Sequence, residues 1–304
     1  MDIDLVYLWV DGNDPKWVKK KEHYINRKIN TKGRYDNNQE LKYSLRSVDK
    51  HLPWIRKIFI LTDNQVPSFI NPDHPKIEII DHSQVMPKEI LPTFNSSVIE
   101  HFIYKIPGLS EHYLYSNDDM FVNADLAPSF FFKNGIPIMR MLKDPILRQK
   151  LFLKRLFKIE INTYMLAIEN AYNLFEKTFK IFYPIKQHHN IDAYLKSDYK
   201  LIMEDIFKDE LEPMFKNRFR HPSDIHRMLI NYYAIKNHRG VLTFSSSYES
   251  CRLKVHKTNY QKKLDKYTPK LFCLNDSEHA RDEHRAQVEP FLKKRFPNKA
   301  QFEV

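Results

Sequence analysis

Two adjacent aspartates, Asp118 and Asp119, are the residues whose types and position most clearly suit chemistry. They follow an apolar and aromatic run at residues 113–116. An acidic pair just beyond a buried strand suits a hard divalent cation, which takes oxygen ligands and neutralises phosphate charge. Asn and Asp also favour turns, so Asn117, Asp118 and Asp119 taken alone are equally compatible with a turn that closes the strand. The other polar segments of the chain bear on this choice.

Two further strand ends carry polar side chains. Trp9, Asp11 and Gly12 end the first apolar run. A base can stack near Trp9, and the loop beyond it can reach a ribose or phosphate; an ordinary Asp-Gly turn is the structural alternative. Asn275 and Asp276 repeat the pattern of a strand followed by Asn-Asp. Asp276 therefore offers a second carboxylate directed at a metal.

Helix starts supply a second group of candidates. Arg46 lies one or two turns inside a helix that follows a polar loop. Free backbone donors at a helix start favour a phosphate, and a guanidinium binds it at two points. Capping by Asp36 or Asn37 explains the same loop without a ligand. Residues 91–96, which include Asn95, form another capped helix start.

Imidazole and guanidinium groups complete the candidates. His189 lies three residues before Asp192, and a histidine serves as a general base or in a phosphate clamp. Arg218 and Arg220 precede a helix predicted to begin near Pro222, where an arginine can neutralise a transferring phosphate or simply lie on the surface. The chain has 14 histidines, so a solvated surface residue is the structural alternative for any single one.

Composition bounds the class of protein. The chain has 304 residues, of which 42% are hydrophobic, enough to bury a large core. Its formal charge of +11 implies acidic partners, and its 5 glycines exclude a Gly-rich dinucleotide fingerprint and a P-loop. Cys251 and Cys273 are too few for a disulfide framework. The N-terminus lacks a secretory pattern and no apolar run of about 18 residues occurs, so the sequence predicts a cytoplasmic protein.

Alternating strands and helices must position these side chains, and they predict an α/β protein with a mostly parallel sheet covered on both faces. In such folds ligands bind beyond the carboxyl ends of the strands, where Asp11, Asp63 and Asp81 would join the Asp118-Asp119 pair. Strands are predicted at residues 3–10, 57–62, 77–80, 113–116 and 241–244, and helices at residues 41–52, 98–106, 222–237 and 282–296.

A basic helical stretch between residues 145 and 182 interrupts this alternation. It predicts an amphipathic helix or helix pair that either packs on the core or lies on a membrane surface. We interpret it as an insertion. The predicted organisation is therefore an N-terminal part of the catalytic core at residues 1–142, a helical insertion at 143–186 and the C-terminal part of the core at 187–304.

Read in order, these segments resemble the Stealth family of sugar-1-phosphate transferases. This family includes bacterial capsular polysaccharide phosphotransferases and, more distantly, the animal lysosomal-enzyme N-acetylglucosamine-1-phosphotransferase. Four ordered blocks carry the resemblance and cover more than half of the chain: residues 3–17, then 34–132, then 189–192 with 218–224, and finally 273–297. The second block is especially similar at residues 36–38, 43–48, 91–96 and 117–121.

The resemblance implies a Rossmann-like core and transfer of a hexose-1-phosphate from a UDP-sugar to a glycan or polysaccharide hydroxyl, with release of UMP. Capsular or cell-surface polysaccharide synthesis is the implied process. A Mg²⁺ or Mn²⁺ ion would lie near Asp118, Asp119, Asn275 and Asp276. Asp119 would be the main catalytic carboxylate, His189 would deprotonate or orient the acceptor hydroxyl, and Arg220 would stabilise charge on the transferred phosphate. The donor pocket would be shaped by Trp9, Asp11, Gly12, Asn38, Arg46 and Asn95.

Two other functions fit parts of the sequence. A metal-dependent glycosyltransferase uses the same kind of acidic strand end but releases UDP. A basic nucleic-acid-binding protein fits the charge, but the lysines are spread along the chain and no nucleic-acid-binding motif is apparent, so we expect no nucleic-acid partner. The basic helical stretch further predicts attachment at the cytoplasmic face of the inner membrane, together with capsule assembly proteins.

Overall fold

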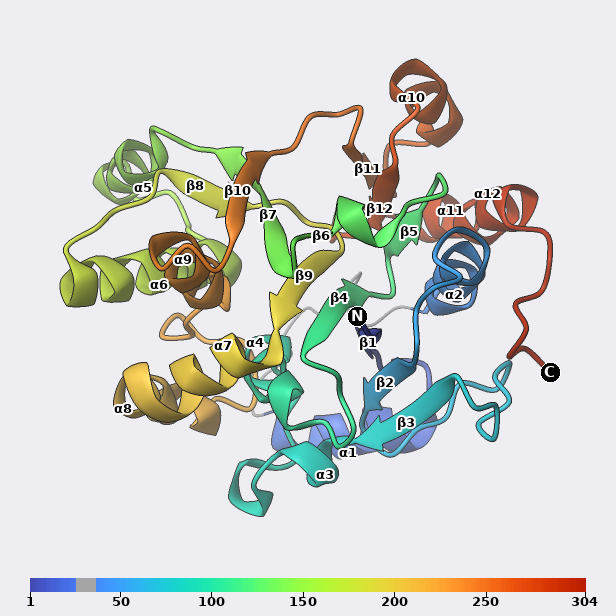
Figure 1. Ribbon diagram of the computed structural model, residues 1–304, viewed down its shortest axis with the longest axis horizontal. Helices are drawn as coiled ribbons and strands as arrows, with labels where there is room; N and C mark the ends of the chain where they lie inside the picture. The colour runs from blue at the N-terminus through green and yellow to red at the C-terminus, as the bar shows by residue number, and fades with distance from the viewer. Residues whose placement is uncertain (26–36) are drawn as a thin grey trace.

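A five-stranded sheet forms the centre of the computed structural model, which describes residues 1–25 and 37–304 (Figure 1). Its strands lie in the order β3-β2-β1-β4-β9, and all neighbours run parallel except β9, which is antiparallel to β4. The mostly parallel sheet predicted from the sequence is confirmed. The strands are β1 (Ile3–Leu8), β2 (Ile58–Thr62), β3 (Ile77–Asp81), β4 (His112–Asn117) and β9 (Asp192–Leu195).

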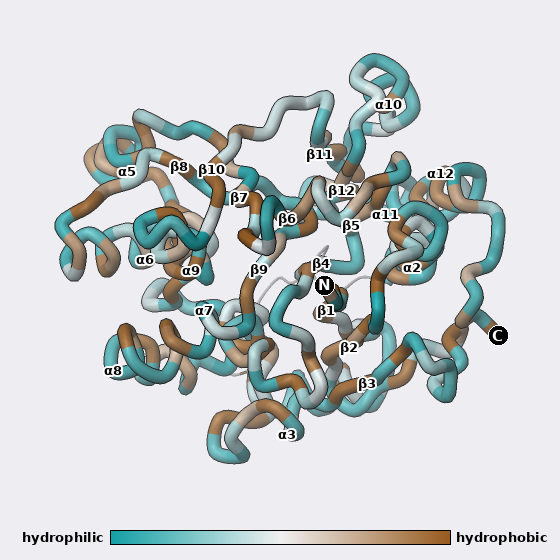
Figure 2. Tube along the Cα trace, viewed as in Figure 1, coloured by the Kyte–Doolittle hydropathy of each residue, from teal (hydrophilic) through white to brown (hydrophobic). Residues whose placement is uncertain are grey.

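Both faces of this sheet are covered, because successive side chains of a strand point to opposite sides. In β1, Val6 joins a core with residues of α4 (Ser96–Ile99) and the short helix η2 (Glu100–Lys105), whereas Leu5 and Tyr7 join a second core with α2 (Glu40–His51). Figure 2 shows hydrophobic stretches in the interior strands and a largely hydrophilic α10 (Tyr260–Tyr267) at the periphery. The interior strands β1, β2 and β4 are mostly apolar and buried because both faces of the sheet are covered.

Smaller sheets extend the central one. After β4 the chain turns into β5 (Met120–Val122), which lies at the edge of a second sheet ordered β11-β12-β5. A third sheet has the order β10-β7-β6, with β8 pairing β7 from outside this path. The added strands are β6 (Phe132–Lys133), β7 (Ile136–Lys143), β8 (Ile185–Gln187), β10 (Val241–Phe244), β11 (Ser250–Lys254) and β12 (Leu271–Asn275).

The helical stretch predicted between residues 145 and 182 forms α5 (Leu147–Leu156) and α6 (Thr163–Phe179). α6 packs against α9 (Met228–Lys236), and β8 pairs with the end of β7. The division into a core and a 143–186 insertion stays a prediction. The remaining helices are α1 (Pro15–Tyr24), α3 (His82–Val85), η1 (Lys88–Ile90), η3 (Pro128–Phe130), α7 (Lys196–Leu201), η4 (Ile202–Ile206), α8 (Lys208–Leu211), η5 (Glu212–Lys216), α11 (Asp282–Arg285) and α12 (Val288–Arg295).

One predicted helix start is wrong, and the cap of another helix differs from the expected one. The helix expected near Pro222 begins at Met228, because the buried carboxylate of Asp224 accepts a hydrogen bond from the backbone N–H of His221 and holds these residues in a turn. At α2 the cap residue is Gln39, which has a left-handed backbone and no capping side chain. Asn37 accepts a bond from the Gln39 N–H instead, and Asp36 lies outside the described residues.

Across the described residues, no helix is long and apolar enough to cross a bilayer.

Candidate active site

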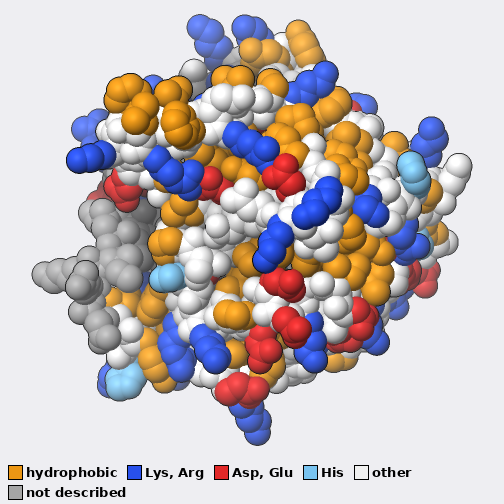
Figure 3. All heavy atoms as spheres, turned by 90° about the vertical axis from the view of Figure 1, so that its left-hand side faces the viewer, with side chains coloured by type: hydrophobic (Ala, Val, Ile, Leu, Met, Phe, Trp, Pro, Cys, Tyr) orange, Lys and Arg blue, Asp and Glu red, His pale blue; other side chains and the backbone are white. Residues whose placement is uncertain are grey.

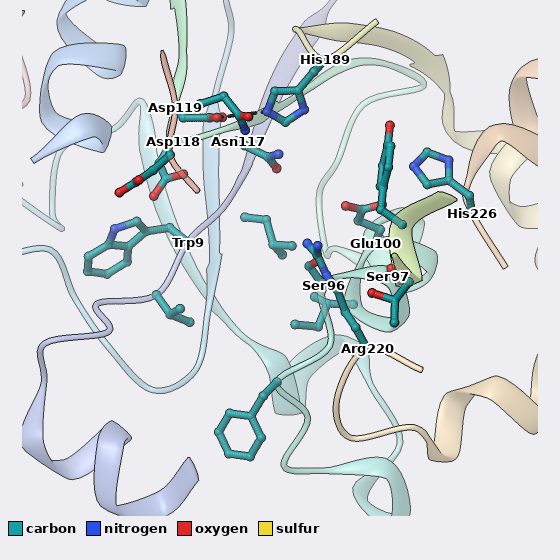
Figure 4. Close-up of a pocket in the computed structure, with 18 of the residues that line it drawn as sticks. Trp9, Ser96, Ser97, Glu100, Asn117, Asp118, Asp119, His189, Arg220 and His226 are labelled. Atoms are coloured by element: carbon teal, nitrogen blue, oxygen red, sulfur yellow. Dashed lines mark hydrogen bonds and ion pairs between the residues drawn. The ribbon is translucent and has the colours of Figure 1, made fainter. Parts of the chain in front are cut away.

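A cavity of about 540 Å³ opens at the carboxyl ends of β1 and β4. Figure 4 shows its floor and walls: Trp9, Asp118 and Asp119 lie on one side, and Glu100, Arg220 and His226 on the other. Residues 274–278, at the end of β12 and just beyond it, also line it. Ligands of open α/β sheets bind at this edge, so the sheet topology accounts for the location.

The turn at Asp118 and Asp119 joins two sheets. β4 ends at Asn117 and β5 begins at Met120, so the two carboxylates lie at the junction. β12 runs antiparallel to β5 and pairs Cys273 with Met120, and the Leu274 N–H donates to the Asp119 carbonyl at 2.8 Å. This pairing brings Asn275 and Asp276 to the same end of the cavity.

His189 reaches Asp119 because β9 is antiparallel to β4. The start of β9 therefore lies beside the end of β4, with Asp192 opposite Tyr115, and the loop just before β9 carries His189. Its Nε2 lies 3.0 Å from the Asp119 Oδ2 (Figure 4). His188 points elsewhere, towards the Ser250 hydroxyl, and burial lowers its pKa to about 4. Of these two adjacent histidines, His189 lines the cavity.

The acidic side of the cavity contains carboxylates that repel one another. Desolvation, reinforced by the charges of Glu40 and Asp119, raises the pKa of Asp118 well above its usual range. Burial also raises the pKa of Glu40 to about 7, although Asn38 donates hydrogen bonds to it. The Asp119 Oδ1 is buried without a hydrogen-bond partner. A bound cation would stabilise the ionised forms of Asp118 and Glu40 and would give the Asp119 Oδ1 a partner.

A divalent ion fits Asp118 and Asp119 only as part of its ligand set. Among residues 1–25 and 37–304, no group of three His, Cys, Asp or Glu side chains is arranged to hold a metal. Mg²⁺ commonly takes one or two carboxylates and completes its shell with substrate phosphates and water. The unpartnered Asp119 Oδ1 and the desolvated Asp118 match that pattern, so the residues present fit such an ion.

Asn275 and Asp276 line the cavity, but arginines engage their side chains. The Arg285 Nε donates to Asp276 Oδ2 at 2.7 Å and its Nη2 to Oδ1 at 3.2 Å. Arg252 donates to the Asn275 Oδ1. A role for these two residues as metal ligands stays a prediction, and it requires these guanidinium groups to move.

Arg220 lies opposite the carboxylates. Its Nη2 donates to the Ser96 hydroxyl at 2.9 Å, which directs the guanidinium along the cavity wall (Figure 4). Asn95 holds this loop in place, since its Nδ2 donates to Asp224 Oδ2 at 2.9 Å and its Oδ1 caps α4 through the Ser97 N–H. Asn95 is fully buried and does not line the cavity. Its predicted contact with the donor is therefore replaced by a positioning role.

Other predicted donor-site residues do not reach the cavity. The Arg46 guanidinium is buried between Glu303, at 2.6 Å and 2.8 Å, and the carbonyl oxygen of Phe296, which ties α2 to the C-terminus. The Asp11 side chain accepts from the Asn13 N–H, the turn that was the structural alternative. Gly12 follows it in that turn, and Asn38 contacts the cavity only through Glu40. The two remaining strand-end aspartates also bind groups of the protein itself: Asp63 pairs with Lys20, and Asp81 caps α3.

A buried arginine that sequence reasoning missed forms part of the far wall. The Arg227 guanidinium donates to Glu100 at 2.7 Å, to Asp192 at 3.0 Å and to the Tyr194 hydroxyl at 3.1 Å. Its charge, opposing the effect of burial, lowers the pKa of Glu100, whereas burial raises that of Asp192 to about 6. No motif marks Arg227, because its partners come from two separate segments, Glu100 from η2 and Asp192 and Tyr194 from β9.

The start of α6 also contributes to the wall, through its cap residue Asn162 and its first two residues, Thr163 and Tyr164. The Tyr164 ring lies edge-on to His226, with centroids 5.3 Å apart. Glu40, at the start of α2, is a further lining residue that sequence reasoning did not single out, although it directly follows the polar loop at residues 36–39.

Comparison with known proteins identifies the family. Models of Stealth protein conserved regions match at residues 1–29 (region 1), 34–138 (region 2) and 262–304 (region 4). The capsular polysaccharide phosphotransferase fcs1 of Haemophilus influenzae is 37% identical, over 90% of this chain and 78% of that protein. The chain belongs to the Stealth family. A second relative, the capsular polysaccharide phosphotransferase WcwK of Streptococcus pneumoniae, is 30% identical over 99% of both chains.

The fold of this Stealth protein is shared with a glycosyltransferase. The galactosyltransferase LgtC, solved in complex with donor and acceptor sugar analogs, aligns over 98% of this chain and 96% of its own, with a TM-score of 0.50 and 12% identity. The Rossmann-like core expected from the resemblance is confirmed. The block placed at residues 189–192 and 218–224 lies outside the three matched ranges, yet its His189 and Arg220 both line the cavity.

Proposed function

We propose that this protein transfers a hexose-1-phosphate from a UDP-sugar to a hydroxyl of a glycan acceptor in capsular polysaccharide synthesis, and releases UMP. The observation that carries this proposal is the His189–Asp119 pair, which faces Arg220 across one cavity in a chain related to capsular polysaccharide phosphotransferases. A base, a carboxylate and an arginine around one space are what phosphoryl transfer requires, because it depends on positioning and charge neutralisation.

His189 would act as the base. An ionised Asp119 can only accept, so the Nε2 of His189 carries the proton in their 3.0 Å contact and Nδ1 carries the lone pair. The acceptor oxygen would form a bond to the sugar-linked phosphorus while its proton moves to Nδ1. The bond from that phosphorus to the bridging oxygen breaks, and its electron pair leaves with UMP. Asp119 would stabilise the imidazolium that forms.

Arg220 would neutralise charge on the transferred phosphate, because its guanidinium lies on the wall opposite the carboxylates. Trp9 would give the uracil base an apolar contact. Asp118 and the Oδ1 of Asp119 would hold Mg²⁺ or Mn²⁺ at the donor. When bound, such an ion supplies Lewis-acid stabilisation of the pyrophosphate.

The acceptor glycan would bind at the wall formed by Asn162, Thr163 and Tyr164. An aromatic face beside polar side chains is suited to a sugar ring. These residues lie outside the three matched family regions. The cytoplasmic location and the association with capsule assembly proteins stay predictions.

A product assay tests the proposal. Purified protein would be incubated with UDP-sugars, a capsule-type oligosaccharide and Mg²⁺ or Mn²⁺, and the assay would resolve UMP from UDP. We expect acceptor-dependent UMP, lost in Asp119→Asn and after chelation, and retained in Asp125→Asn, whose exposed carboxylate lies outside the cavity. Release of UDP would instead show that the protein is a glycosyltransferase, as LgtC is.

A further inference from the structure

The face of α5 exposes an unusual set of large apolar side chains. Of the described residues, six exposed large hydrophobics lie within residues 146–159: Ile146, Phe152, Leu153, Leu156, Phe157 and Ile159. Phe152 is 64% exposed, Leu156 61% and Phe157 67%. Contiguous apolar surface of this kind marks an interaction site in a soluble domain.

This face is fixed rather than loosely packed. Leu147 and Leu151 bury the opposite side of α5 in the core. Arg148 and Arg155 on α5 pair with glutamates of α6, and the Arg148 guanidinium also lies 3.8 Å from the centroid of the Phe182 ring. The helix is therefore held in one orientation, with its outer apolar side chains in solvent.

Cations surround the apolar residues. Residues 143–160 contain Lys143, Arg148, Lys150, Lys154, Arg155 and Lys158 but only two acidic residues, Asp144 and Glu160. Arg148 and Arg155 pair with glutamates of α6 and Lys150 pairs with Asp144, whereas Lys154 and Lys158 form no salt bridge with the described residues. Figure 3 looks onto the side of the molecule that carries α5, and hydrophobic and basic side chains gather together on its upper part. A helix with an apolar face flanked by Lys and Arg is the pattern of a segment that lies in a membrane interface.

We propose that the α5 face, from Ile146 to Ile159, seats this protein on an anionic lipid surface. A second copy of the chain is disfavoured as the occupant because two such basic faces repel each other. A soluble acidic polymer satisfies the cations but leaves Phe152, Leu156 and Phe157 in water. An anionic bilayer accommodates both kinds of side chain.

Docking in this way would bring the active-site cavity towards the membrane. The chain leaves the α5 face at Ile159 and reaches the cavity wall at Asn162, Thr163 and Tyr164 only a few residues later. The inference does not depend on the proposed reaction, because it rests on the surface of α5 alone and its test requires no turnover.

Vesicle flotation tests the apolar part. The full chain would be mixed with phosphatidylcholine vesicles with or without phosphatidylglycerol. We expect binding only to the anionic vesicles. A Phe152→Ser/Leu156→Ser/Phe157→Ser variant should bind at least about 100-fold more weakly, and a Val66→Ser/Val304→Ser control, with equally exposed apolar residues elsewhere, should bind normally.

Charge variants test the electrostatic part. Lys154→Gln/Lys158→Gln should weaken binding to anionic vesicles by about 30-fold, on the order expected for two cations at the surface. The same charge change on α12, Lys293→Gln/Lys294→Gln, should have little effect. Thermal unfolding would verify that each variant is folded. Equal binding to neutral vesicles, no vesicle binding, or unchanged binding of the serine variant would each overturn the proposal, as would a dimer that the serine substitutions dissociate.

Discussion

The contact between His189 and Asp119 predicts that the two side chains act as one unit. Their Nε2 and Oδ2 atoms are 3.0 Å apart, and the side chains are 28% and 18% exposed. With an effective dielectric constant of about 20, Coulomb's law gives about 5.5 kcal/mol for an imidazolium and a carboxylate at this distance. Solvent screening reduces the contribution to the barrier to about 3 kcal/mol, or roughly 100-fold in rate.

The test is a double-mutant cycle on acceptor-dependent UMP release, measured as kcat/KM. His189→Ala and Asp119→Asn should each lower the rate by at least about 100-fold. Their combination should be little worse than the more damaging single variant, because a broken pair cannot be broken again. Independent roles would instead multiply to about 10,000-fold.

A matched control exists in the same chain. His51 and Asp125 form another His–Asp pair, at 2.6 Å, outside the residues that line the cavity. His51→Ala and Asp125→Asn should leave turnover within about 2-fold, because neither side chain lines the cavity. Multiplicative losses at His189 and Asp119, or near-normal turnover of either variant, would refute the paired mechanism.

Three further predictions follow from buried and cavity-lining groups. Arg227→Met leaves Glu100 and Asp192 without their cation, so the free energy of unfolding in urea should fall by about 3–5 kcal/mol; Lys57→Met, at a partly exposed pair, should change it by no more than about 1 kcal/mol. Burial lowers the pKa of His101 from 6.5 to about 4. As the pH falls, the unfolded chain therefore binds the proton first, and the stability that is present above pH 6.5 is lost as the pH falls towards 4. In a His101→Phe variant, the free energy of unfolding should change less steeply with pH over this range, by up to about 1.4 kcal/mol per pH unit. An unchanged slope would contradict the assignment. Tyr164→Ala should raise the acceptor KM by about 3- to 10-fold and leave the donor KM unchanged, whereas the exposed Tyr248→Ala should change neither; a rise in the donor KM alone would place Tyr164 at the other substrate.

Much of the central fold could be predicted because its signals are local. The continuous apolar runs of β1 to β4 are long enough to identify buried strands, and α2 shows helical spacing at Leu41, Leu45 and Val48. The start of α9 was predicted too early, because the turn before it depends on Asp224, whose partner Asn95 lies 129 residues away. Such a contact has no local signal.

Some residues of the candidate site have a local signal in the sequence, whereas the surroundings of others depend on distant segments. Adjacency along the chain is enough to mark Asp118 and Asp119, and the family motifs mark His189 and Arg220. Arg46 belongs to an equally similar motif, yet its guanidinium is buried against Glu303 near the C-terminus and does not line the cavity. A guanidinium has the same local pattern whether its acidic partner is a phosphate or a distant carboxylate, so sequence alone does not separate the two.

The family, the mostly parallel sheet and the acidic turn after β4 could all be inferred from the amino-acid sequence, because each follows from neighbouring residues or ordered motifs. Three features became visible only in the folded chain: His189 contacts Asp119, Arg227 binds Glu100 and Asp192, and the outer side of α5 remains in solvent. These features arise from antiparallel pairing of β9 with β4 and from packing between distant segments. The physical reason is that strand order and side-chain burial depend on the free energy of the whole core, whereas strand and helix patterns reflect the residues of one segment.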